Sequence, residues 1–306
     1  MRVPISAARR AAIMTAACCI AAVSAVAQSP TEGWGAVDRA FGRPGTAQPG
    51  DVQKYSFPRS DLRVRTGGVE VKPALALGSW VALKRMGSSG GEALAMGDLV
   101  LLESEVAPVI SKLQSLGVQQ TALHNHLQHE SPRVMYLHIE AQGDPVKIGE
   151  AVRAALALTK TPSAPPAAAA PGSGFGLDTV KLATALGHPG KVTGGVYQVS
   201  VPRAESVRMG GMEIPLSMGV ATALNFQPTG EGKAAITGDF VLTADEVNPV
   251  IRSLRDGGVE VTALHSHMLG EEPRLYFMHF WAIDQAEKLA RTLHEALGHM
   301  KVKAPA

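Results

Sequence analysis

The sequence predicts an α+β fold made of two homologous repeats, each a largely antiparallel sheet with helices on one face, packed as a pseudo-twofold pair. The first observation is an internal duplication, because the two copies align without a gap from Gly78 and Gly219 to Leu156 and Leu297, each residue 141 positions later. The second is that runs of alternating or continuous apolar residues, typical of strands, occur in the same order in both copies. The third is that capped helical segments separate these runs.

Three helices are expected in each copy. Gly42 and Gly187 end the first helix of each half, because a glycine after the last periodic residue is a common helix stop. Gly117 ends the second helix of the first half, for which Ser104 can serve as the N-cap. Thr243 begins the counterpart helix, with a glutamate three residues later that completes a capping box. The expected helices span 37–41, 105–116 and 145–158, then 180–186, 245–255 and 285–297.

Six extended segments are expected in each copy, and the last two of each copy form a hairpin around a polar loop. Their apolar residues either alternate with polar ones or run continuously, as in half-buried and fully buried strands respectively. In the first copy these segments span 52–57, 62–65, 79–84, 94–102, 119–126 and 133–140. In the second copy they span 195–201, 206–209, 220–226, 234–242, 260–267 and 274–281.

The duplication and a change of composition divide the chain into four segments. The middle of the chain is rich in proline and alanine, which is typical of a semi-rigid tether between two folded units. We therefore expect a signal peptide at 1–27, a first repeat domain at 28–159, a linker at 160–174 and a second repeat domain at 175–306.

The first residues have the pattern of an export signal. Three arginines within the first ten residues precede the apolar run 11–26, which is shorter than the roughly 20 residues of a membrane span. Small residues then lead to a cleavage site near Ala27. This pattern predicts a periplasmic or secreted mature protein. A lipoprotein acylated at Cys18 or Cys19 is the alternative.

Composition excludes several classes of function. Both cysteines lie in the expected signal peptide, so a mature chain has no disulfide, no thiol nucleophile and no zinc–thiolate site. The formal net charge is only +2, and no basic stripe with interleaved aromatic residues predicts binding to nucleic acid. No later hydrophobic stretch is long enough for a transmembrane segment in the mature chain.

The most informative motif contains three histidines and a glutamate in each copy. Alternate residues of a strand point to the same side, so the two histidines of each His-x-His share one face. All three histidines share that face if His124 lies opposite His138, or if His126 lies opposite Val134. A register shifted by one residue would turn the third histidine away. The repeated residues are His124, His126, Glu130 and His138, then His265, His267, Glu271 and His279.

Imidazoles in this pattern, with a carboxylate nearby, predict a divalent transition metal, zinc or copper in the first instance. Glu130 and Glu271 are candidates for a fourth ligand or a general base. The alternative is that the histidines only form structural hydrogen bonds within half-buried strands. We expect two related sites, one in each half.

Two further repeated pairs lie near this motif. Arg133 and Arg274 follow the loop and could bind an anion, or brace the loop by pairing with its glutamate. Asp98 and Asp239 each follow a glycine and could orient a ligand histidine. The alternative for these aspartates is a polar turn or strand-end residue.

Long stretches of the second copy carry a resemblance to a known family. Gly238–Leu242, Glu246–Val250 and Thr262–His279 resemble the LppY/LpqO-like proteins, which are exported bacterial proteins of unknown function that often contain a duplicated domain. This resemblance implies export but no established activity. The histidine motif alone also resembles the first metal motif of the cupins. Cupins are all-β, however, and the expected helices limit that similarity to the motif.

Three hypotheses for function follow. The first is a metal-binding protein, and the second is a metal-dependent enzyme in which Glu271 acts as general base. The third is a module that binds a small molecule or a cell-envelope ligand without metal. A concave pocket over the histidine face would favour the enzyme, whereas an outward-facing Trp281 and Tyr276 would favour a glycan platform. The sequence leaves the oligomeric state open.

Overall fold

The computed structural model describes residues 33–87, 91–164 and 174–304. Its strands form two six-stranded antiparallel sheets, one in each half of the chain. The strand order is β1-β2-β5-β6-β8-β7 in the first half and β9-β10-β13-β14-β17-β15 in the second. Because the two orders correspond strand by strand, the halves share one topology, and the fold class predicted from the sequence is confirmed.

The first half contains four helices and eight strands within the described residues. Its helices are α1 (Gly35–Phe41), α2 (Pro73–Ala76), α3 (Glu103–Ser115) and α4 (Pro145–Leu156). Its large sheet contains β1 (Thr46–Gln48), β2 (Val52–Pro58), β5 (Gly78–Met86), β6 (Glu92–Leu102), β7 (Gln119–His124) and β8 (Val134–Gly143). A short hairpin consists of β3 (Arg65–Thr66) and β4 (Val69–Glu70).

The second half repeats this order. Its helices are α5 (Thr179–Leu186), α6 (Ala244–Asp256) and α7 (Ala286–Leu297), with a short 3-10 helix η1 (Leu216–Met218) in the place of α2. Its large sheet contains β9 (Lys191–Thr193), β10 (Val196–Pro202), β13 (Ala221–Gly230), β14 (Lys233–Leu242), β15 (Glu260–His265) and β17 (Tyr276–Gln285). The smaller strands are β11 (Arg208–Met209), β12 (Met212–Glu213) and β16 (Glu271–Glu272).

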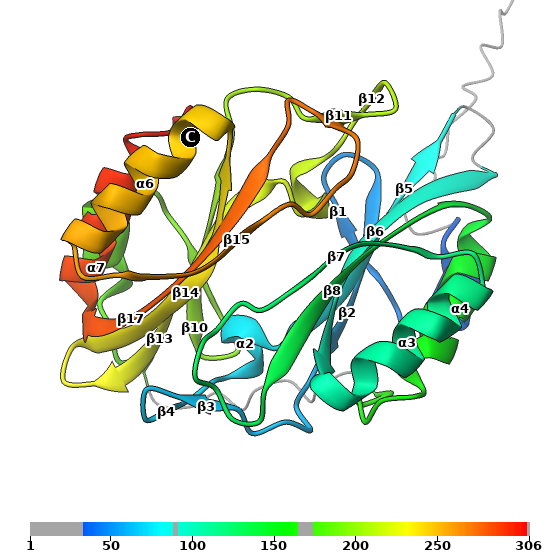
Figure 1. Ribbon diagram of the computed structural model, residues 1–306, viewed down its shortest axis with the longest axis horizontal. Helices are drawn as coiled ribbons and strands as arrows, with labels where there is room; N and C mark the ends of the chain where they lie inside the picture. Colours follow the sequence, from blue (N-terminus) through cyan, green and yellow to red (C-terminus); the bar gives the residue numbers. More distant parts are fainter. Residues whose placement is uncertain (1–32, 88–90, 165–173, 305–306) are drawn as a thin grey trace, which may run out of the picture.

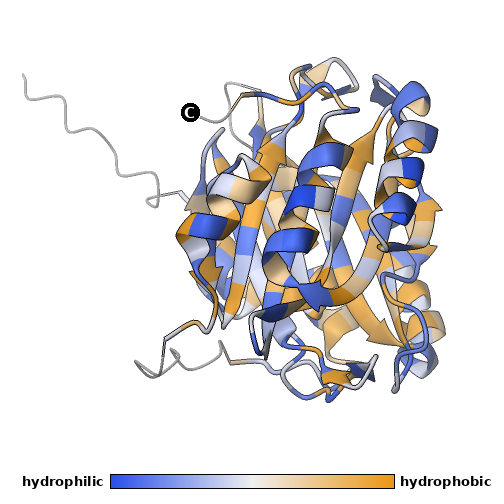
Figure 2. Ribbon diagram, turned by 90° about the vertical axis from the view of Figure 1, so that its left-hand side faces the viewer, coloured by the Kyte–Doolittle hydropathy of each residue, from blue (hydrophilic) through white to orange (hydrophobic). Residues whose placement is uncertain are grey.

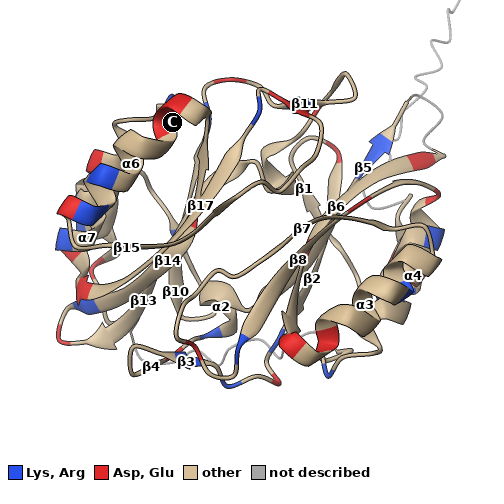
Figure 3. Cartoon of the chain, in the orientation of Figure 1, with Lys and Arg blue, Asp and Glu red and all other residues tan. Residues whose placement is uncertain are grey.

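The two sheets lie between two outer layers of helices, and their inner faces point toward each other (Figure 1). Each half has its own apolar core between sheet and helices, with Phe41 and Val152 in the first and Phe240 and Leu293 in the second. Figure 2 shows hydrophilic outer surfaces on the helices that cover the second sheet and mostly hydrophobic strands behind them. Many of the charged residues coloured in Figure 3 likewise lie on the outer helices. Amphipathic helices on one face of a sheet produce this layering.

Two smaller apolar clusters join the halves across the inner faces. In one, Leu75 and Leu77 of the first half pack with Trp281 of the second, and in the other, Met268 and Phe277 of the second half contribute to a cluster that includes first-half residues. The segments between β2 and β5 and between β10 and β13 supply much of this contact. The pseudo-twofold pairing is therefore an apolar interface in which each half covers part of the other.

Hydrogen bonds also cross between the halves. The Thr262 hydroxyl donates to the carbonyl of His126 at 2.6 Å, and the Asn125 amide donates to the carbonyl of Thr262 at 3.1 Å. At another part of the interface, the Gln198 amide donates to the carbonyl of Ala74 at 2.8 Å. The two bonds of Thr262 involve residues of both histidine motifs, so they fix the position of one motif relative to the other.

The sequence alignment without gaps is wrong over one strand. Trp80 lies opposite Asp98, and the equivalent of Asp98, Asp239, lies opposite Ala223. Trp80 and Ala223 are therefore structural equivalents, although they are 143 rather than 141 positions apart. The difference arises because the chain from Trp80 to Asp98 is two residues longer than the chain from Ala223 to Asp239. Local sequence similarity could not reveal this, since the register of a strand is decided by its partners.

Most helix ends agree with the sequence, and one does not. Gly42 and Gly187 have φ of 73° and 79°, the left-handed conformation that favours glycine after a helix. The predicted cap at Ser104 is wrong, because α3 already begins at Glu103. The Glu105 carboxylate instead accepts from the backbone N–H of Leu102 at 2.8 Å, so the acidic residue satisfies the helix start without a hydroxyl.

A buried arginine lies at equivalent places in the two halves. Arg59 donates to Glu105 at 2.7 Å and to Asp61 at 2.9 Å, and its side chain is 0% exposed. Arg203 donates to Glu246 at 2.6 Å in the second half and is also 0% exposed. Each arginine ties the end of β2 or β10 to the start of α3 or α6, so a buried charge is compensated where sheet and helix meet.

The ends of the predicted domains fall partly outside the described residues. The expected signal peptide at 1–27 and most of the linker at 160–174 belong to this part of the chain. Where the linker is described, Arg43 donates to the carbonyls of Pro162 and Ser163, both at 2.8 Å, so its start lies against the first half. Among the described residues, no helix is both long and apolar enough to cross a membrane.

Candidate metal centre

Each histidine motif lies on a hairpin whose register places its side chains on one face. His124 lies opposite Tyr136, and Ala122 lies opposite His138. This is the register in which His126 would lie opposite Val134, one of the two that put all three histidines on one side. The second half has the same register, with His265 opposite Phe277. In both hairpins a bulge precedes the motif and shifts the pairing by one residue.

The two motifs meet in one cluster between the sheets. The ring centres of His124 and His265 are 3.5 Å apart, on the pseudo-twofold axis. The rings of His126 and His279 are 3.7 Å apart, and so are those of the equivalent pair, His138 and His267. Within this cluster each half keeps its own three histidines together, so the expectation of two related sites stays a prediction. The pairing of the inner sheet faces brings all six histidines into one centre, which sequence analysis of either half could not show.

All six imidazoles direct an unpaired nitrogen into this centre. The Nε2 atom of every one is buried and has no hydrogen-bond partner among the described residues. Three of the rings donate instead through Nδ1: His124 to Asn125 at 3.2 Å, His265 to Ser266 at 3.4 Å and His279 to Gly238 at 2.7 Å. A backbone acceptor at Nδ1 fixes the tautomer that leaves the Nε2 lone pair free, as in histidines that bind a metal.

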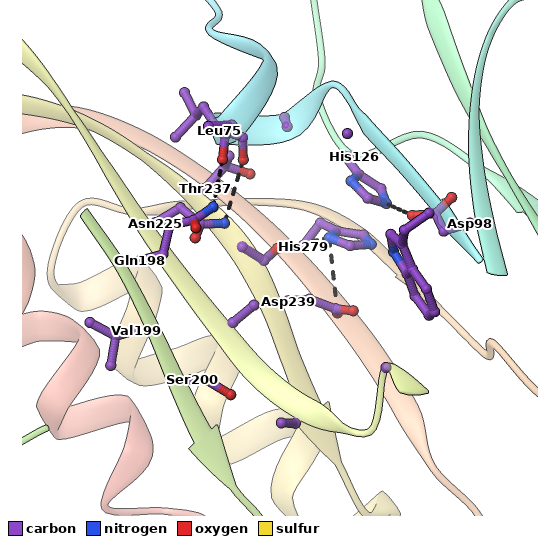
Figure 4. Close-up of a pocket in the computed structure, with 18 of the residues that line it drawn as sticks. Leu75, Asp98, His126, Gln198, Val199, Ser200, Asn225, Thr237, Asp239 and His279 are labelled. Carbon is purple, nitrogen blue, oxygen red and sulfur yellow. Dashed lines mark hydrogen bonds and ion pairs between the residues drawn. The ribbon is translucent and has the colours of Figure 1, made fainter. Parts of the chain in front are cut away.

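Two aspartates lie beside the histidines, with the side chain of Asp98 8% exposed and that of Asp239 17% exposed. The Asp98 carboxylate lies 3.8 Å from Nε2 of His126 and 3.9 Å from Nε2 of His138. Asp239 lies 3.6 Å from Nε2 of His267, and Figure 4 shows it beside His279. Both aspartates stand in the middle of a strand, so the alternative of a turn or strand-end residue is wrong. One oxygen of each has no hydrogen-bond partner within the described chain.

The glycine before each aspartate has a structural reason. A Cβ atom at Gly97 would lie 2.7 Å from the carbonyl oxygen of Trp80, and one at Gly238 would lie 1.9 Å from that of Ala223. Only glycine therefore allows the neighbouring strand to approach so closely. The repeated Gly-Asp pair therefore combines a packing requirement with a carboxylate that lies beside the histidines.

Burial determines the protonation of these groups. It lowers the pKa of His124 to about 3, an effect that His265 reinforces, and it lowers the pKa of His265 itself to about 4. The pKa of each of the other four histidines falls well below its ordinary value for the same reason. Burial raises the pKa of Asp98 to about 7, with Lys54 opposing the shift, and that of Asp239 well above its ordinary value. The centre thus resists protonation of its imidazoles.

These donors fit a transition-metal ion. Histidines 124, 265, 267 and 279, and separately 124, 126 and 138, offer ligand atoms within 4.8 Å of one another. An ion such as zinc holds its nitrogen ligands at about 2.0–2.1 Å, so any two of them lie at most about 4.2 Å apart. Small movements of the rings would meet that limit. Neutral imidazoles with carboxylates beside them are a donor set suited to zinc or copper.

Aromatic rings close the cluster on two sides. Tyr136 stacks on His126 with ring centres 3.3 Å apart, and the equivalent Phe277 stacks on His267 at 3.6 Å. The Tyr136 hydroxyl donates to the carbonyl of Ala76 at 2.9 Å, so this side chain also anchors the segment that contains α2. Packed rings restrict the rotation of the imidazoles and hold the donors in place.

The repeated glutamates do not belong to this donor set. Glu271 accepts from the backbone N–H of Leu275 at 2.9 Å and lies 3.4 Å from Arg274. Glu130 accepts from the N–H of Val134 at 3.3 Å. Neither appears in the groups of potential ligands found within the described residues. This geometry favours bracing of the loop over the predicted roles of fourth ligand or general base.

The arginines after the loop lie toward the surface. Arg274 donates to Ser266 at 3.1 Å and to the carbonyl of Met268 at 3.3 Å, with its side chain about half exposed. Arg133 is exposed. Of the two alternatives for Arg274, an anion site or a loop brace, the observed contacts favour the brace. Trp281 is 8% exposed, which does not suit a glycan platform.

A pocket of about 470 Å³ lies next to the cluster and continues between the sheets. Its wall includes His126, His138, His267 and His279 together with both aspartates. Figure 4 shows that Gln198, Val199 and Ser200 line it farther from the histidines. The centre is therefore accessible from a cavity large enough for a small molecule.

Two residues of this pocket were missed by sequence analysis. The Lys54 ammonium lies 4.0 Å from the ring centre of Trp80 and donates to the carbonyl of Ser217 at 3.2 Å. Burial lowers the pKa of Lys54 to about 8, against the attraction of Asp98. Neither residue belongs to a motif or to a repeated position, and only the strand order places them near the aspartates.

Comparison with known proteins finds solved structures of low similarity. None of the curated proteins matches the sequence. Among solved structures, the trimeric bacterial microcompartment shell protein PduB shares 12% identity over 82% of this chain and 88% of its own, with a TM-score of 0.21. EtuB from Clostridium kluyveri shares 10% identity over 83% and 90%, with a TM-score of 0.20. TM-scores this low carry no argument about fold or function.

One family model covers both halves. The model described as Domain of Unknown Function (DUF1259) matches residues 35–158 and again residues 180–299. These two matches include every histidine and aspartate of the cluster and most of the described chain. The protein therefore belongs to the Domain of Unknown Function (DUF1259) family and contains its domain twice.

Proposed function

We propose that this protein is an exported metal-binding protein that holds one transition-metal ion, zinc or copper, in a centre shared by its two halves. The observation that carries the proposal is the convergence of six unpaired Nε2 atoms and two aspartates in one buried cluster. Buried polar groups without partners are costly, by about 1–3 kcal/mol each and more when charged. A bound cation would satisfy all of them at once.

Charge supports a cation more strongly than it supports structural histidines. Histidines that serve only packing are expected to form hydrogen bonds through both ring nitrogens or to be exposed. Here the free nitrogens face one another and two carboxylates, and burial already disfavours protonation of the rings. A divalent ion would offset both aspartates and provide partners for the imidazole lone pairs.

The stoichiometry follows from the sharing of one residue. Both groups of close donors contain His124. A neutral imidazole with a fixed tautomer offers one lone pair, so an ion held by the four-histidine group takes His124 away from the first-half group. We therefore expect one ion per chain, with ligands from both halves.

The sequence alone supports the proposal that the protein is exported. The basic and apolar leader with a cleavage site near Ala27 supports a periplasmic or secreted location, as does the resemblance to the LppY/LpqO-like proteins. In such a location, a binding site made of imidazole and carboxylate is insensitive to the oxidation that affects cysteine. This agrees with a mature chain that contains no cysteine.

The test is the metal content of the untagged protein that begins at Gln28, measured by elemental mass spectrometry. We expect about one equivalent of zinc or copper for the intact centre. The variant with His265→Ala and His267→Ala should lose the ion, whereas His299→Ala, an exposed histidine outside the cluster, should retain it. Absence of metal from the folded protein, even after incubation with zinc and copper salts, would refute the proposal.

The pocket favours a second function, a metal-dependent enzyme. A closed metal site would need no cavity, but four of the six histidines line a pocket. In an enzyme, an open position on the ion could bind and activate water. Since Glu271 is occupied with its loop, the role of general base predicted for it has no support in this geometry.

An open coordination position can be detected directly. Cobalt(II) replaces zinc in many sites and gives a visible spectrum that depends on its ligands. Addition of azide should change that spectrum if a position faces the pocket, and should leave it unchanged if protein ligands fill every position. The second result would favour metal storage or structural binding over catalysis.

A further inference from the structure

The pocket beside the histidine cluster has two walls that derive from equivalent strands. Trp80, Asp98 and His138 stand side by side on β5, β6 and β8 of the first half. Ala223, Asp239 and His279 are their equivalents on β13, β14 and β17. The two walls thus carry the same candidate donors, and these donors line one end of the pocket.

Beyond the donors, the two walls differ. The first half presents an indole where the second has Ala223, and a lysine, Lys54, where the second has Gln198. The Gln198 amide is committed to the carbonyl of Ala74, so it supplies no charge to the pocket. Ala223 has only a methyl group at the place where the first half has the indole of Trp80. The first wall thus carries a lysine and an aromatic ring, whereas the lysine of the second wall is Lys191 of β9.

The charge of the filled site favours an anion. Lys54 and Lys191 both line the pocket, and with a divalent ion they outweigh the charges of Asp98 and Asp239. Within the described residues, the ammonium of Lys54 donates one hydrogen bond, to the carbonyl of Ser217, and it has three N–H groups to donate. An oxyanion that reached both Lys54 and the metal would receive a charge-assisted hydrogen bond.

The remaining wall is suited to an apolar group. Leu75, Leu216 and Trp80 line the same cavity, and its volume of about 470 Å³ lies in the range of sites for small organic ligands. Inorganic anions would leave this apolar surface uncovered. A molecule with an acid group at one end and an apolar body at the other would cover it.

We propose that the pocket binds a small organic carboxylate, with its acid group between Lys54 and the metal ion and its apolar part against Trp80. The inference deepens the proposed function and rests on it, since the metal supplies part of the affinity. It specifies the class of ligand that the centre would meet, and in an enzyme it would specify the class of substrate.

The test is isothermal titration calorimetry with benzoate, which combines a carboxylate and an apolar ring. Benzamide, which has nearly the same shape and no charge, and inorganic phosphate serve as the two comparison probes. Each is titrated into the metal-loaded protein, into the metal-free protein and into the variant Lys54→Met. Lys233→Met, an exposed lysine outside the pocket, is the matched control. Metal content is measured on every sample.

We expect benzoate to bind the loaded protein and benzamide not to bind. Lys54→Met should weaken benzoate binding at least about tenfold, as expected for a lost charge-assisted hydrogen bond of about 1.5–3 kcal/mol. Lys233→Met should bind normally, and Lys54→Arg should restore part of the affinity. The metal content should be unchanged in all three variants.

Other outcomes separate this proposal from that of the metal centre. Bound metal without benzoate binding, or benzoate binding that is equal in Lys54→Met, overturns the carboxylate proposal and leaves the metal centre intact. Binding of phosphate but not benzoate also overturns it. Benzoate binding that depends on Lys54 in a protein that takes up no metal would support the acid pocket and refute the metal centre.

Discussion

The two halves of the molecule agree at the metal donors and differ at the pocket. Each half contributes three histidines and one aspartate from the same strands, and each buries an arginine at the same junction of sheet and helix. In contrast, Trp80 and Lys54 of the first half correspond to Ala223 and Gln198 of the second. A duplicated chain can keep a symmetric centre on its pseudo-twofold axis while the surfaces beside it diverge. In the functions proposed above, this division would separate metal binding from recognition of a ligand.

The largest expected effect tests whether the halves share the ion. Replacement of His124 and His126 by alanine should remove the ion as completely as replacement of His265 and His267. Replacement of a residue that is hydrogen-bonded to a metal ligand typically lowers the metal affinity roughly 10–100-fold. Loss of the ligands themselves should lower it by more. Elemental mass spectrometry measures the occupancy of both variants. Retention of about one equivalent in each would instead indicate two independent sites.

The next effect tests the equivalence of the two buried arginines. Arg59→Met and Arg203→Met each leave a buried glutamate without its partner, which should lower the free energy of unfolding by about 3–5 kcal/mol. Urea denaturation measures both changes. The double variant Arg203→Met with Glu246→Leu removes both charges and should be less destabilised than the single variant. A much smaller effect in one half would show that the two junctions differ in importance.

Replacement of the two packed glycines should give unequal effects. Gly97→Ala and Gly238→Ala force a strand away from its neighbour, at a typical cost of about 1–3 kcal/mol. Gly238→Ala should cost more, because its Cβ would lie 1.9 Å from a carbonyl oxygen, against 2.7 Å for Gly97→Ala. Thermal denaturation compares them with Gly91→Ala, where no atom lies within 4 Å of an added Cβ. Equal stability of all three would contradict the close approach of the strands.

A smaller effect concerns the aromatic residues that stack on the cluster. Tyr136→Phe makes the first half resemble the second, which has Phe277 at the equivalent place. It removes the hydrogen bond to Ala76 and should cost about 1 kcal/mol in urea denaturation. The ring that stacks on His126 stays, so the metal content should not change. Loss of the ion would assign the hydroxyl a role at the centre.

The smallest effect is a pH dependence of the stability, caused by Glu246, the partner of the buried Arg203. Burial opposes ionisation of Glu246, but the hydrogen bond from Arg203 and two backbone N–H groups hold its pKa below the ordinary value of 4.5. As pH falls, Glu246 is therefore protonated in the unfolded chain before it is protonated in the folded protein. Its contribution to stability is complete above pH 4.5 and is lost as pH falls through its folded-state pKa. The double variant without both charges should show a shallower loss of stability below pH 4.5. An unchanged slope would refute this link.

Much of the fold was predictable because it depends on local pattern. The helices that end at Gly42 and Gly187 follow from glycine after an apolar periodicity, and the strands from alternation. The expected hairpin of the first motif has the register that places its three histidines together. Ser104 was wrongly assigned as a cap because a nearby glutamate can satisfy the same backbone N–H, and sequence does not distinguish the two.

The sequence by itself determined the duplication, the two α+β units and the residues that converge on the centre, since all of these depend on residue type and on the periods of helix and strand. Only the tertiary structure decided that the two motifs form one centre, that Asp98 and Asp239 face its histidines, and that Lys54 and Trp80 line a pocket beside it. These outcomes depend on which strands are neighbours and on which faces of the two sheets meet. Such contacts join residues far apart in the chain, so no local pattern encodes them.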